Sequence, residues 1–513
     1  MTGLLTDQLR MMAASYPDET AYRNLEDDTS ITFAGWDRRS NRLAHGLAGR
    51  GVARGDRVAL SMRAEDILEW IVAYSAVHKL GAVAVPMNNR LSAPEVRGIL
   101  EHAEPVALVT SGSYGPTVGP LIGSLPSLGV VATVGAPGID GATALEDVLA
   151  NDDSAIQATL DGDDLADIMY TSGTTGRPKG VAVRHNQVAR VPNGLPEWQG
   201  TAWLTASPVF TFAGLGFIHN PMKAGMTVLY QPSFDAGRWL AIVERERPVS
   251  AFVVPAMARL LIHHPSFASA DLSSLRLLVL GSAPLAPDTL LRLQAALPRA
   301  AVLNSYGMTE GGHATFTMDP EAARTRPGAV GRPTPPVEVR IVGEDGQVCP
   351  TGEVGEVLTR NPGGHREYYR DPEATARQWE GGWLHTGDLG HLDADGYLFI
   401  VGRKKEMIVR GGMNVYADDV EAAIHAHPEV IEAAVVGIPH DVLGEDIAAY
   451  VVLQPASATT VDELLAFVGQ RLADYKVPRR VVVVEALPRN AGGKVVKADL
   501  ATATVVDRPV PAH

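Results

Sequence analysis

The chain has 513 residues, of which 46% are hydrophobic and 20% are charged, and its formal charge at pH 7 is −15. A chain this long exceeds one ordinary hydrophobic core, so we expect two or more domains. The acidic balance disfavours nonspecific nucleic-acid binding. The single cysteine, Cys349, excludes an intrachain disulfide and a cysteine-based zinc or iron–sulfur site.

Membrane and export signals are absent from the pattern. The N-terminus has no basic start followed by an apolar run, so it predicts no secretory signal. The most apolar early segment, residues 67–87, is interrupted by His78 and Lys79 and predicts a core helix followed by a strand. We therefore expect a soluble, cytoplasmic protein with no membrane partner.

Helices and strands alternate along the first part of the chain. Apolar spacing predicts helices over residues 4–15, 36–51, 66–80 and 93–103. Short apolar runs predict strands over residues 30–33, 57–61, 82–86, 106–109 and 165–170. Further strands are predicted over 251–255 and 275–280. This alternation indicates an α/β fold with a largely parallel sheet.

The pattern changes after Val337. Short strands with Gly, Asp and Pro turns over residues 337–401 predict antiparallel β structure. A compact αβ pattern follows, with helices over 418–426 and 461–472 and strands over 430–436, 447–453 and 480–484. We place a domain boundary between them, which gives an N-terminal domain over residues 1–402 and a C-terminal domain over residues 403–513.

The stretch Met169-Tyr-Thr-Ser-Gly-Thr-Thr-Gly-Arg-Pro-Lys-Gly180 has the composition of an anion-binding turn. Glycines permit positive φ, and consecutive N–H groups in such a turn form a concave nest for anions. The hydroxyl side chains and the two cations indicate a triphosphate-binding loop, because a plain surface turn does not need so many of them. Because Gly180 follows Lys179, the stretch is not a Walker loop. The candidate phosphate contacts are Thr171, Ser172, Gly173, Thr174, Thr175, Gly176 and Lys179.

The string from Tyr170 to Gly180 resembles the phosphate loop of the adenylate-forming superfamily, which includes acyl-CoA synthetases, nonribosomal adenylation domains and beetle luciferases. The matching blocks span Asp167 to Lys497. The N-terminal region agrees only in its alternation of helices and strands. The resemblance implies a large N-terminal domain of parallel and mixed sheets flanked by helices, with a β-barrel-like subdomain. A small, mobile α+β domain would follow at the C-terminus.

A second string, Asn304-Ser-Tyr-Gly-Met-Thr-Glu310, resembles the superfamily's nucleotide and magnesium motif. Tyr306 would offer a flat face to a purine, Thr309 a hydrogen bond to a phosphate, and Glu310 a carboxylate to Mg²⁺. The turn after the strand at 275–280 lies where ligands bind in open α/β sheets. The candidate nucleotide contacts in these two places are Gly281, Ser282, Ala283, Asn304, Ser305, Tyr306, Gly307 and Thr309.

Two further strings resemble the parts that hold ribose and join the domains. In Trp383-Leu-His-Thr-Gly-Asp388, the resemblance implies that Asp388 accepts hydrogen bonds from the ribose hydroxyls, with Arg403 as the second ribose contact. Lys405 aligns with the hinge. The pair Gly411-Gly412 would approach the pantetheine arm of coenzyme A, because only glycine leaves room there.

The string Pro488-Arg-Asn-Ala-Gly-Gly-Lys494 resembles the segment that carries the superfamily's catalytic lysine. Lys494 would bridge the substrate carboxylate and the α-phosphate. We interpret Lys497 as an ordinary surface lysine. The expected catalytic residues are Lys494, Glu310 and Thr171, and the chemistry requires no protein nucleophile.

The resemblance implies ATP-dependent activation of a carboxylic acid to an acyl-adenylate with release of pyrophosphate, and transfer to coenzyme A. The cofactors would be ATP, Mg²⁺ and coenzyme A. A carrier-protein phosphopantetheine as acceptor, or adenylation alone, remains open. A P-loop-like kinase or NTPase is disfavoured by the absent Walker pair, and a non-catalytic nucleotide-binding protein by Glu310 and Lys494. A monomer and a homodimer are both compatible with the sequence.

The acid is less well defined. In Ser207-Pro-Val-Phe-Thr-Phe-Ala-Gly214, Thr211 stands where many acyl-CoA synthetases have a histidine. The candidate acyl-pocket residues are Phe210, Thr211, Phe212, Gly214, Gly311, Gly312 and His313, with Gly216 and Gly281 also in the wall. The glycines suggest room for a large group, and no arginine stands out for a second carboxylate. We predict an apolar aromatic, alicyclic or fatty monocarboxylic acid; His313 fits a substrate contact or a packing residue.

Overall fold

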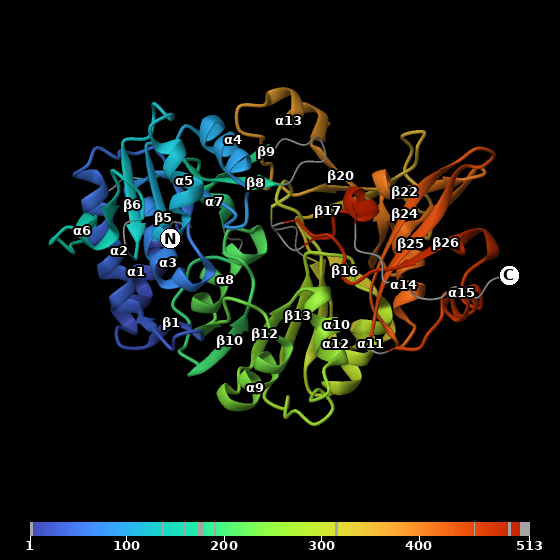
Figure 1. The fold of residues 1–513 in the computed structure, drawn as a ribbon. Coiled ribbons are helices and arrows are strands. Elements are labelled where there is room, and N and C mark those ends of the chain that lie inside the picture. The colour runs from blue at the N-terminus through green and yellow to red at the C-terminus, as the bar shows by residue number, and fades with distance from the viewer. Residues whose placement is uncertain are drawn as a thin grey trace.

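The computed structural model describes residues 4–135, 138–156, 160–171, 179–188, 191–312, 316–455, 457–490 and 494–502. Figure 1 shows two sheets flanked by helices at the left and below, a third sheet near the centre, and a smaller C-terminal sheet at the right. The predicted α/β class with a large N-terminal part and a small α+β part is confirmed.

The first sheet has seven strands and carries the segment before the phosphate loop. Its order is β7 (Thr143–Ala144), β6 (Val130–Val134), β5 (Ala107–Ser111), β3 (Arg57–Ser61), β4 (Val83–Pro86), β8 (Leu165–Thr171) and β9 (Lys179–Arg184). Only β8 and β9 pair antiparallel. Its helices and 3₁₀ turns are η1 (Ala64–Asp66), α3 (Ile67–Leu80), α4 (Ala93–Ala103), η2 (Gly112–Tyr114), α5 (Gly115–Ile122), α6 (Leu145–Val148) and α7 (His185–Val188).

The second sheet also has seven strands, in the order β14 (Ala301–Ser305), β13 (Leu277–Gly281), β12 (Ser250–Val253), β10 (Thr201–Thr205), β11 (Met226–Tyr230), β1 (Thr20–Asn24) and β2 (Ser30–Thr32). All pairs except β1–β2 are parallel. Its helices are α1 (Leu5–Ser15), α2 (Phe33–Ala48), α8 (Phe212–Lys223), α9 (Ala236–Glu246), α10 (Pro255–His263) and α11 (Pro287–Ala296). The parallel strands β13 and β14 end together, with Gly281 opposite Ser305.

The third sheet is antiparallel, as predicted for residues 337–401. Its order is β15 (Phe316–Thr317), β16 (Ala329–Pro333), β21 (Leu398–Arg403), β20 (Trp383–Leu392), β18 (Gly355–Arg360) and β17 (Glu338–Val342), with β19 (Trp379–Glu380) beside β20. Helices α12 (Pro320–Thr325) and α13 (Pro372–Gln378) lie between its strands in the sequence.

The C-terminal sheet begins directly after a single 3₁₀ turn, η3 (Lys404–Glu406), that follows β21. Its order is β23 (Met413–Tyr416), β22 (Met407–Arg410), β25 (Gly444–Leu453) and β24 (Val430–His440), with β26 (Arg480–Val483) beside β25. The helical elements are α14 (Ala417–His425), α15 (Val461–Gly469), η4 (Asp474–Lys476) and η5 (Lys497–Thr502).

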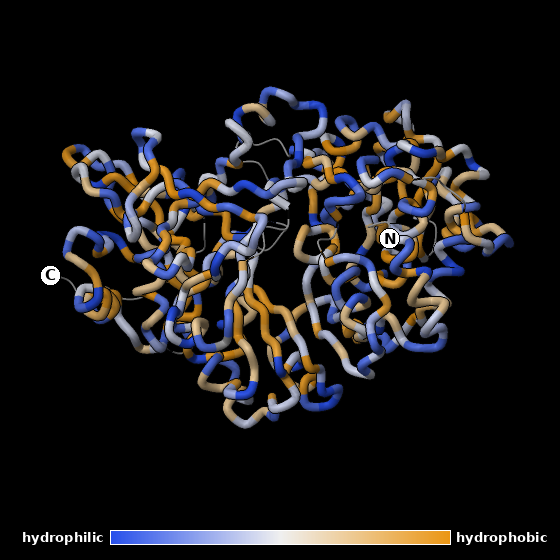
Figure 2. Tube along the Cα trace, turned by 180° about the vertical axis from the view of Figure 1, so that it is seen from behind, coloured by the Kyte–Doolittle hydropathy of each residue, from blue (hydrophilic) through white to orange (hydrophobic). Residues whose placement is uncertain are grey.

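Helix α3 is the centre of the N-terminal core. It contacts β1 of the second sheet and β3 and β4 of the first, so it is buried on every side. Its polar residues are buried with partners: His78 Nε2 lies 3.0 Å from Asp167 Oδ1, and Lys79 Nζ lies 2.8 Å from Asp37 Oδ1. Figure 2 shows hydrophobic residues following the strands inside the molecule. The predicted core helix is confirmed, and among the described residues no helix is long and apolar enough to cross a membrane.

Two predicted boundaries were wrong for physical reasons. The strand predicted over 251–255 ends at Val253, because Pro255 opens α10 at a position where its missing N–H is not needed. The helix predicted over 36–51 is α2, which ends at Ala48 and contains Gly46. A Cβ on Gly46 would lie 1.7 Å from the carbonyl oxygen of Val148, so this glycine serves a close approach and not a helix end.

Candidate active site

The two ends of the predicted phosphate loop lie side by side. Thr171 at the end of β8 pairs with Lys179 at the start of β9. A hydroxyl and an ammonium group therefore flank the loop at its base. The residues between them, 172–178, lie outside the described residues, so the predicted phosphate contacts of Ser172, Gly173, Thr174, Thr175 and Gly176 stay predictions.

Oxygen atoms gather around Glu310. The hydroxyl of Thr171 donates to Glu310 Oε1 at 3.3 Å, and the hydroxyl of Tyr368 donates to the same oxygen at 3.3 Å. Lys179 Nζ lies 4.8 Å from the centroid of the Tyr368 ring. Burial, and next the charge of Glu310, raise the pKa of Tyr368, so it remains a donor. The two motifs predicted to hold phosphates and metal are thus joined through Glu310 and a tyrosine that the motifs did not indicate.

This arrangement fits Mg²⁺ bound together with phosphates. Among the described residues, no group of three or more His, Cys, Asp or Glu side chains could hold a metal ion by itself. Mg²⁺ commonly takes one or two protein carboxylates and completes its octahedral shell with waters and substrate phosphates. Glu310, next to the base of the phosphate loop, supplies a carboxylate of this kind.

The predicted ribose contacts lie opposite each other on β20 and β21. Asp388 pairs in register with Arg403, and its Oδ1 lies 3.0 Å from Arg403 Nε. The hydroxyl of Tyr306 donates to the other oxygen, Oδ2, at 2.6 Å. Asp388 is only 3% exposed, and burial raises its pKa although Arg403, Tyr306 and Lys494 act to lower it. The structure therefore brings the purine and ribose candidates together.

The other nucleotide candidates lie at the ends of parallel strands. Gly281 ends β13, and Asn304 and Ser305 end β14, where ligands bind in open α/β sheets. Ser282 has φ +72°, a backbone conformation that is strained for a residue with a side chain. Ala283, next to it, is exposed, as is Gly307 beyond β14.

Lys494 comes from the C-terminal part of the chain to these N-terminal groups. Its N–H donates to Asn490 Oδ1 at 3.0 Å and its carbonyl accepts from Asn490 N–H at 2.8 Å, which closes a hairpin. The residue is exposed, yet enough protein surrounds its ammonium group that burial lowers its pKa, with Arg403 as the next cause. The charges of Glu310 and Asp388 oppose that shift. The ammonium group of Lys494 and the two carboxylates therefore attract one another, and Lys494 in turn opposes the rise that burial causes in the pKa of Asp388.

The prediction for Lys497 was wrong. Its side chain is 19% exposed, and its Nζ lies 2.8 Å from Glu406 Oε2 and 2.8 Å from Glu421 Oε1. The pKa of Lys497 is raised, because the attraction of Glu421 and Glu406 outweighs the lowering by burial. A lysine three positions after Lys494 looked like a solvated tail residue, and only the folded chain brings the two carboxylates to it.

The predicted hinge and the predicted coenzyme A contact lie on either side of β22. Lys405 is the middle residue of η3, and burial lowers its pKa. Gly411 and Gly412 form the two-residue turn between β22 and β23, with φ of +57° and +83°. Positive φ at both positions is what such a hairpin turn requires. The turn accounts for the glycine pair by itself, and its predicted contact with coenzyme A stays a prediction.

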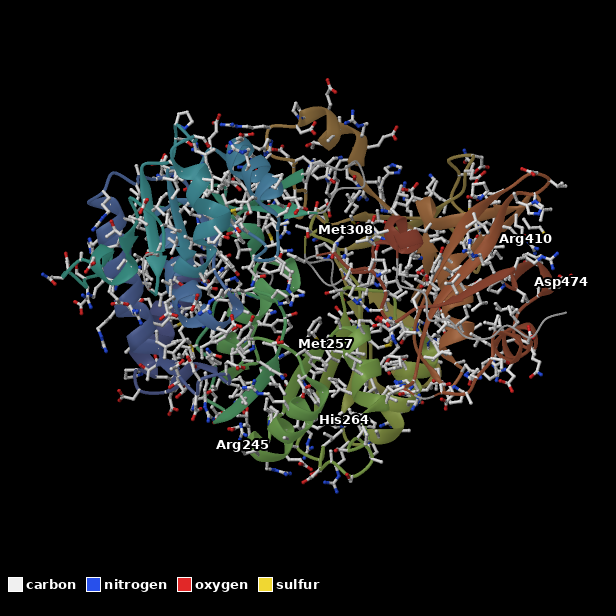
Figure 3. The ribbon with its side chains drawn as sticks, in the orientation of Figure 1. Arg245, Met257, His264, Met308, Arg410 and Asp474 are labelled. Atoms are coloured by element: carbon white, nitrogen blue, oxygen red, sulfur yellow. The ribbon has the colours of Figure 1, made fainter. Side chains whose placement is uncertain are left out.

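The glycine pair lies far from the nucleotide candidates in this arrangement. Figure 3 shows Arg410, the residue before the pair, on the outer side of the C-terminal part, and Met308, within the nucleotide motif, near the centre of the molecule. Arg410 is fixed there by Asp446, whose Oδ1 lies 2.7 Å from Arg410 Nε. The C-terminal part therefore presents Lys494, and not the glycine pair, to the nucleotide motifs.

Thr211, which replaces the expected histidine, caps a helix. Its hydroxyl accepts a hydrogen bond from Gly214 N–H at 3.0 Å and donates to the carbonyl of Pro208 at 2.8 Å. These bonds begin α8, where threonine is a favoured cap. Phe210 precedes the cap and Phe212 opens the helix, both half-buried. Thr211 therefore has a structural role at the start of α8.

The glycines of the predicted acyl-pocket wall are explained by contacts within the protein. A Cβ on Gly214 would lie 1.9 Å from the Pro208 carbonyl oxygen, on Gly281 2.9 Å from the Ser305 carbonyl oxygen, and on Gly311 2.7 Å from Leu384 Cδ2. Gly312 has φ +62°. Gly216 is the exception, since its Cβ would meet only the Asn220 side chain at 3.4 Å. These contacts account for the glycines other than Gly216 without a pocket, and the predicted room for a large acyl group stays a prediction; His313 lies outside the described residues.

Sequence reasoning also missed Arg366, which is 3% exposed. Its guanidinium donates to the carbonyls of Thr309 at 2.8 Å and Gln187 at 2.6 Å, and it lies 4.8 Å from the Phe212 ring centroid. Burial lowers its pKa to about 10. Arg366 thus supports the backbone next to Glu310. Nothing in the sequence around it distinguishes it from a surface arginine.

Comparison with known proteins places this geometry in a family. The model of the AMP-binding enzyme matches residues 9–369, and the model of the AMP-binding enzyme C-terminal domain matches residues 419–494. A feruloyl-CoA synthase from an Amycolatopsis species is 37% identical over 491 residues, which are 94% of this chain and 96% of that protein. The long-chain-fatty-acid–CoA ligase FadD13 of Mycobacterium tuberculosis is 35% identical over 501 residues, 96% of this chain and 97% of that protein.

A solved structure agrees over nearly the whole chain. The anthranilate CoA ligase AuaEII, in complex with anthranoyl-AMP, superposes with a TM-score of 0.88 at 28% identity. The match covers 97% of this chain and 96% of that one.

Proposed function

The chain belongs to the AMP-binding enzyme family, and from that premise we propose which of its residues perform the two half-reactions and on what class of acid. The enzyme is an AMP-forming acyl-CoA synthetase. It activates a carboxylic acid with ATP to an acyl-adenylate, releases pyrophosphate, and transfers the acyl group to coenzyme A.

The observation that carries the assignment of residues is the position of Lys494. In the first half-reaction a carboxylate attacks the α-phosphorus of ATP, and two anions must meet. The ammonium of Lys494, which Glu310 and Asp388 attract, would lie between the substrate carboxylate and the α-phosphate and offset their repulsion. Positioning and charge would then perform the reaction without a covalent enzyme intermediate.

The remaining motif residues would hold the nucleotide. Asp388 and Arg403 would bind the ribose, and the ends of the phosphate loop, Thr171 and Lys179, would bind the β- and γ-phosphates. Glu310 would hold Mg²⁺, which when bound neutralises charge on the leaving pyrophosphate. Thr171 and Tyr368 would orient the Glu310 carboxylate through their hydroxyls.

The acid class rests on the relatives and on the apolar side chains of the predicted wall. Phe210 and Phe212 are half-buried there. Arg366 is the described cation next to Phe212, and two of its donor groups already bond backbone carbonyls. The relatives are named for feruloyl, long-chain fatty and anthranilate substrates. An apolar aromatic, alicyclic or fatty monocarboxylic acid fits both observations.

The second half-reaction would require a different arrangement. The thiol must reach the carbonyl carbon where Lys494 stands, while Gly411 and Gly412 lie on the outer side of the C-terminal part. Rotation of residues 403–513 as a rigid body against residues 1–402, about Lys405 in η3, would exchange the two. The attacking thiol in this half-reaction would belong to coenzyme A or to a carrier protein's phosphopantetheine, which present the same chemical group.

ATP–pyrophosphate exchange with a panel of acids tests this function. We expect exchange with one or more apolar monocarboxylic acids, AMP formation once coenzyme A is added, and loss of both when Mg²⁺ is chelated. Loaded carrier protein in place of coenzyme A tests the alternative acceptor. Exchange with none of the acids, or ADP as the nucleotide product, would contradict the proposal.

A further inference from the structure

Helix α10 of the N-terminal part makes a polar contact with the C-terminal sheet through Arg259. Arg259 Nε, on α10, donates to the carbonyl of Ile431, on β24, at 3.0 Å. Helix α10 contacts β24, and its neighbour α11 contacts α14. In Figure 1, α10 and α11 lie on the side of the N-terminal part that is next to α14. The Arg259 side chain therefore crosses from one part of the chain to the other.

Charged and titratable groups face Arg259 from both parts of the chain. Burial, as the largest cause, lowers the pKa of Arg259, and Arg489 adds to this, while the carboxylates of Glu432 on β24 and Glu421 on α14 oppose it. His425 Nε2 accepts from Ala433 N–H at 3.0 Å, so its imidazole carries its proton on Nδ1 and is neutral. Burial and Arg259 keep the pKa of His425 well below its usual value. On α10 itself, burial, chiefly, lowers the pKa of His263, and Arg292 and Arg259 lower it further.

Strand β24 and helix α14 also hold the Lys494 hairpin, which is the pairing of residues 489–490 with residues 494–495. Before Lys494, Arg489 forms an ion pair with Glu432 of β24. After it, Lys497 forms ion pairs with Glu421 of α14 and with Glu406 of η3. Between these anchors, Arg489 and Val495 form an antiparallel bridge. The hairpin is thus fixed at both ends to the surface against which Arg259 lies.

We propose that Arg259 is a positioning residue for the first half-reaction, which holds the C-terminal part in the arrangement that presents Lys494 to the nucleotide motifs. The proposal rests on the function proposed above. Arg259 touches neither nucleotide nor acid; it acts through β24 and α14 on the Lys494 hairpin. Any rotation that moves Gly411 and Gly412 toward the nucleotide separates β24 from α10 and breaks the contact. The second half-reaction therefore does not need it.

Separate assays of the half-reactions test this role. Arg259→Ala should lower the rate of ATP–pyrophosphate exchange on the order of tenfold, because a hydrogen bond from a charged group is lost. Thioester formation from supplied acyl-adenylate and coenzyme A should stay within about twofold of the parent rate. Arg259→Lys, which keeps the charge, should recover part of the exchange rate. Equal loss in both half-reactions, or no loss in either, would overturn the proposal.

The matched control is Arg245→Ala. Arg245 is an exposed arginine on α9, with 63% of its side chain accessible, and Figure 3 shows it at the lower edge of the molecule, away from the C-terminal part. This variant should leave both half-reactions unchanged. If the parent enzyme shows no exchange with any acid, the proposed function itself is wrong. If the parent shows exchange and Arg259→Ala behaves like the parent, only the inference about Arg259 is wrong.

A distance measurement tests the inference without activity. Val348, 62% exposed on the N-terminal side, and Val442, 84% exposed on the C-terminal side, accept spin labels as cysteine variants in a Cys349→Ser background. We expect one dominant distance in the parent and a reduced share of it after Arg259→Ala. If Arg259→Ala does not fold, Arg259→Gln, which keeps the length of the side chain without its charge, takes its place. Identical distance distributions would overturn the proposal.

Discussion

The nucleotide region and the acyl-pocket wall were both predicted from short sequence strings. The structure brings the residues of the first group together, whereas it gives most glycines of the second a packing role. In the nucleotide region, Thr171, Glu310, Asp388 and Arg403 meet in hydrogen bonds and an ion pair. In the wall, neighbouring protein atoms occupy the space that a Cβ on Gly214 or Gly311 would need. A charged side chain that is buried needs a partner, so its presence in a motif is informative. A glycine can be required for several structural reasons, and close packing against protein atoms accounts for most glycines of the wall.

The largest expected effect tests the charged side of this comparison. Lys494→Ala should reduce ATP–pyrophosphate exchange by a factor on the order of 10² or more, as for the loss of a charge that stabilises a transition state. The control is Arg245→Ala, since Arg245 lies on α9 with 63% of its side chain accessible. Normal exchange in Lys494→Ala would show that the meeting of charges has no catalytic use.

Next in size is the effect of restraining the hinge. Lys405→Pro fixes φ near −65°, which a 3₁₀ turn tolerates, but restricts the rotation that brings the glycine pair to the nucleotide. We expect thioester formation to fall on the order of tenfold or more while pyrophosphate exchange stays within about twofold. Lys405→Ala separates loss of the side chain from loss of backbone freedom. Equal loss of the two half-reactions would argue against a hinge at this residue.

A smaller effect tests the glycine side. Gly214→Ala places a methyl group 1.9 Å from the Pro208 carbonyl oxygen, so we expect a loss of about 1–3 kcal/mol in the free energy of unfolding. Gly216→Ala in the same helix meets only the Asn220 side chain at 3.4 Å and gains helix propensity, so it should be neutral or slightly stabilising. Thermal unfolding of both variants checks this, and equal stabilities would restore the idea of open space at Gly214.

The smallest effect concerns pH. Burial and next Glu421 raise the pKa of Asp418 to about 7, with Glu406 adding to the rise and Lys497 and Arg403 opposing it. A carboxyl whose folded pKa exceeds its unfolded value near 3.9 lowers the stability of the fold as pH rises from about 4 to 7. Asp418→Asn should therefore be more stable than the parent at pH 8 and equally stable at pH 4, as thermal unfolding at the two pH values would show. A gain that does not change with pH would contradict this.

Much of the fold could be predicted from the sequence. Helix α3 and the strands β3 and β13 follow from apolar runs, because burial imposes them locally. The start of α10 at Pro255 was missed, since a strand end and a helix start share the same apolar residues there. The close approach at Gly46 could not be predicted, because Val148, its neighbour in space, lies about a hundred residues away.

The candidate site divides in the same way. Candidate residues within ordered strings could be proposed from the sequence, whereas Tyr368, Arg366 and Lys497 act through partners distant in the sequence. Lys497 looked like a surface lysine because Glu421 and Glu406 come to it only on folding. Such contacts depend on tertiary packing, which local patterns do not encode.

The most direct test is a crystal structure with an acyl-sulfamoyl adenosine, a stable analogue of the acyl-adenylate. We predict that Lys494 Nζ lies about 3 Å from the sulfamoyl group, with Asp388 on the ribose hydroxyls. The adenosine bound elsewhere, or bound at Asp388 with Lys494 directed into solvent and the Arg259–Ile431 contact intact, would contradict the account.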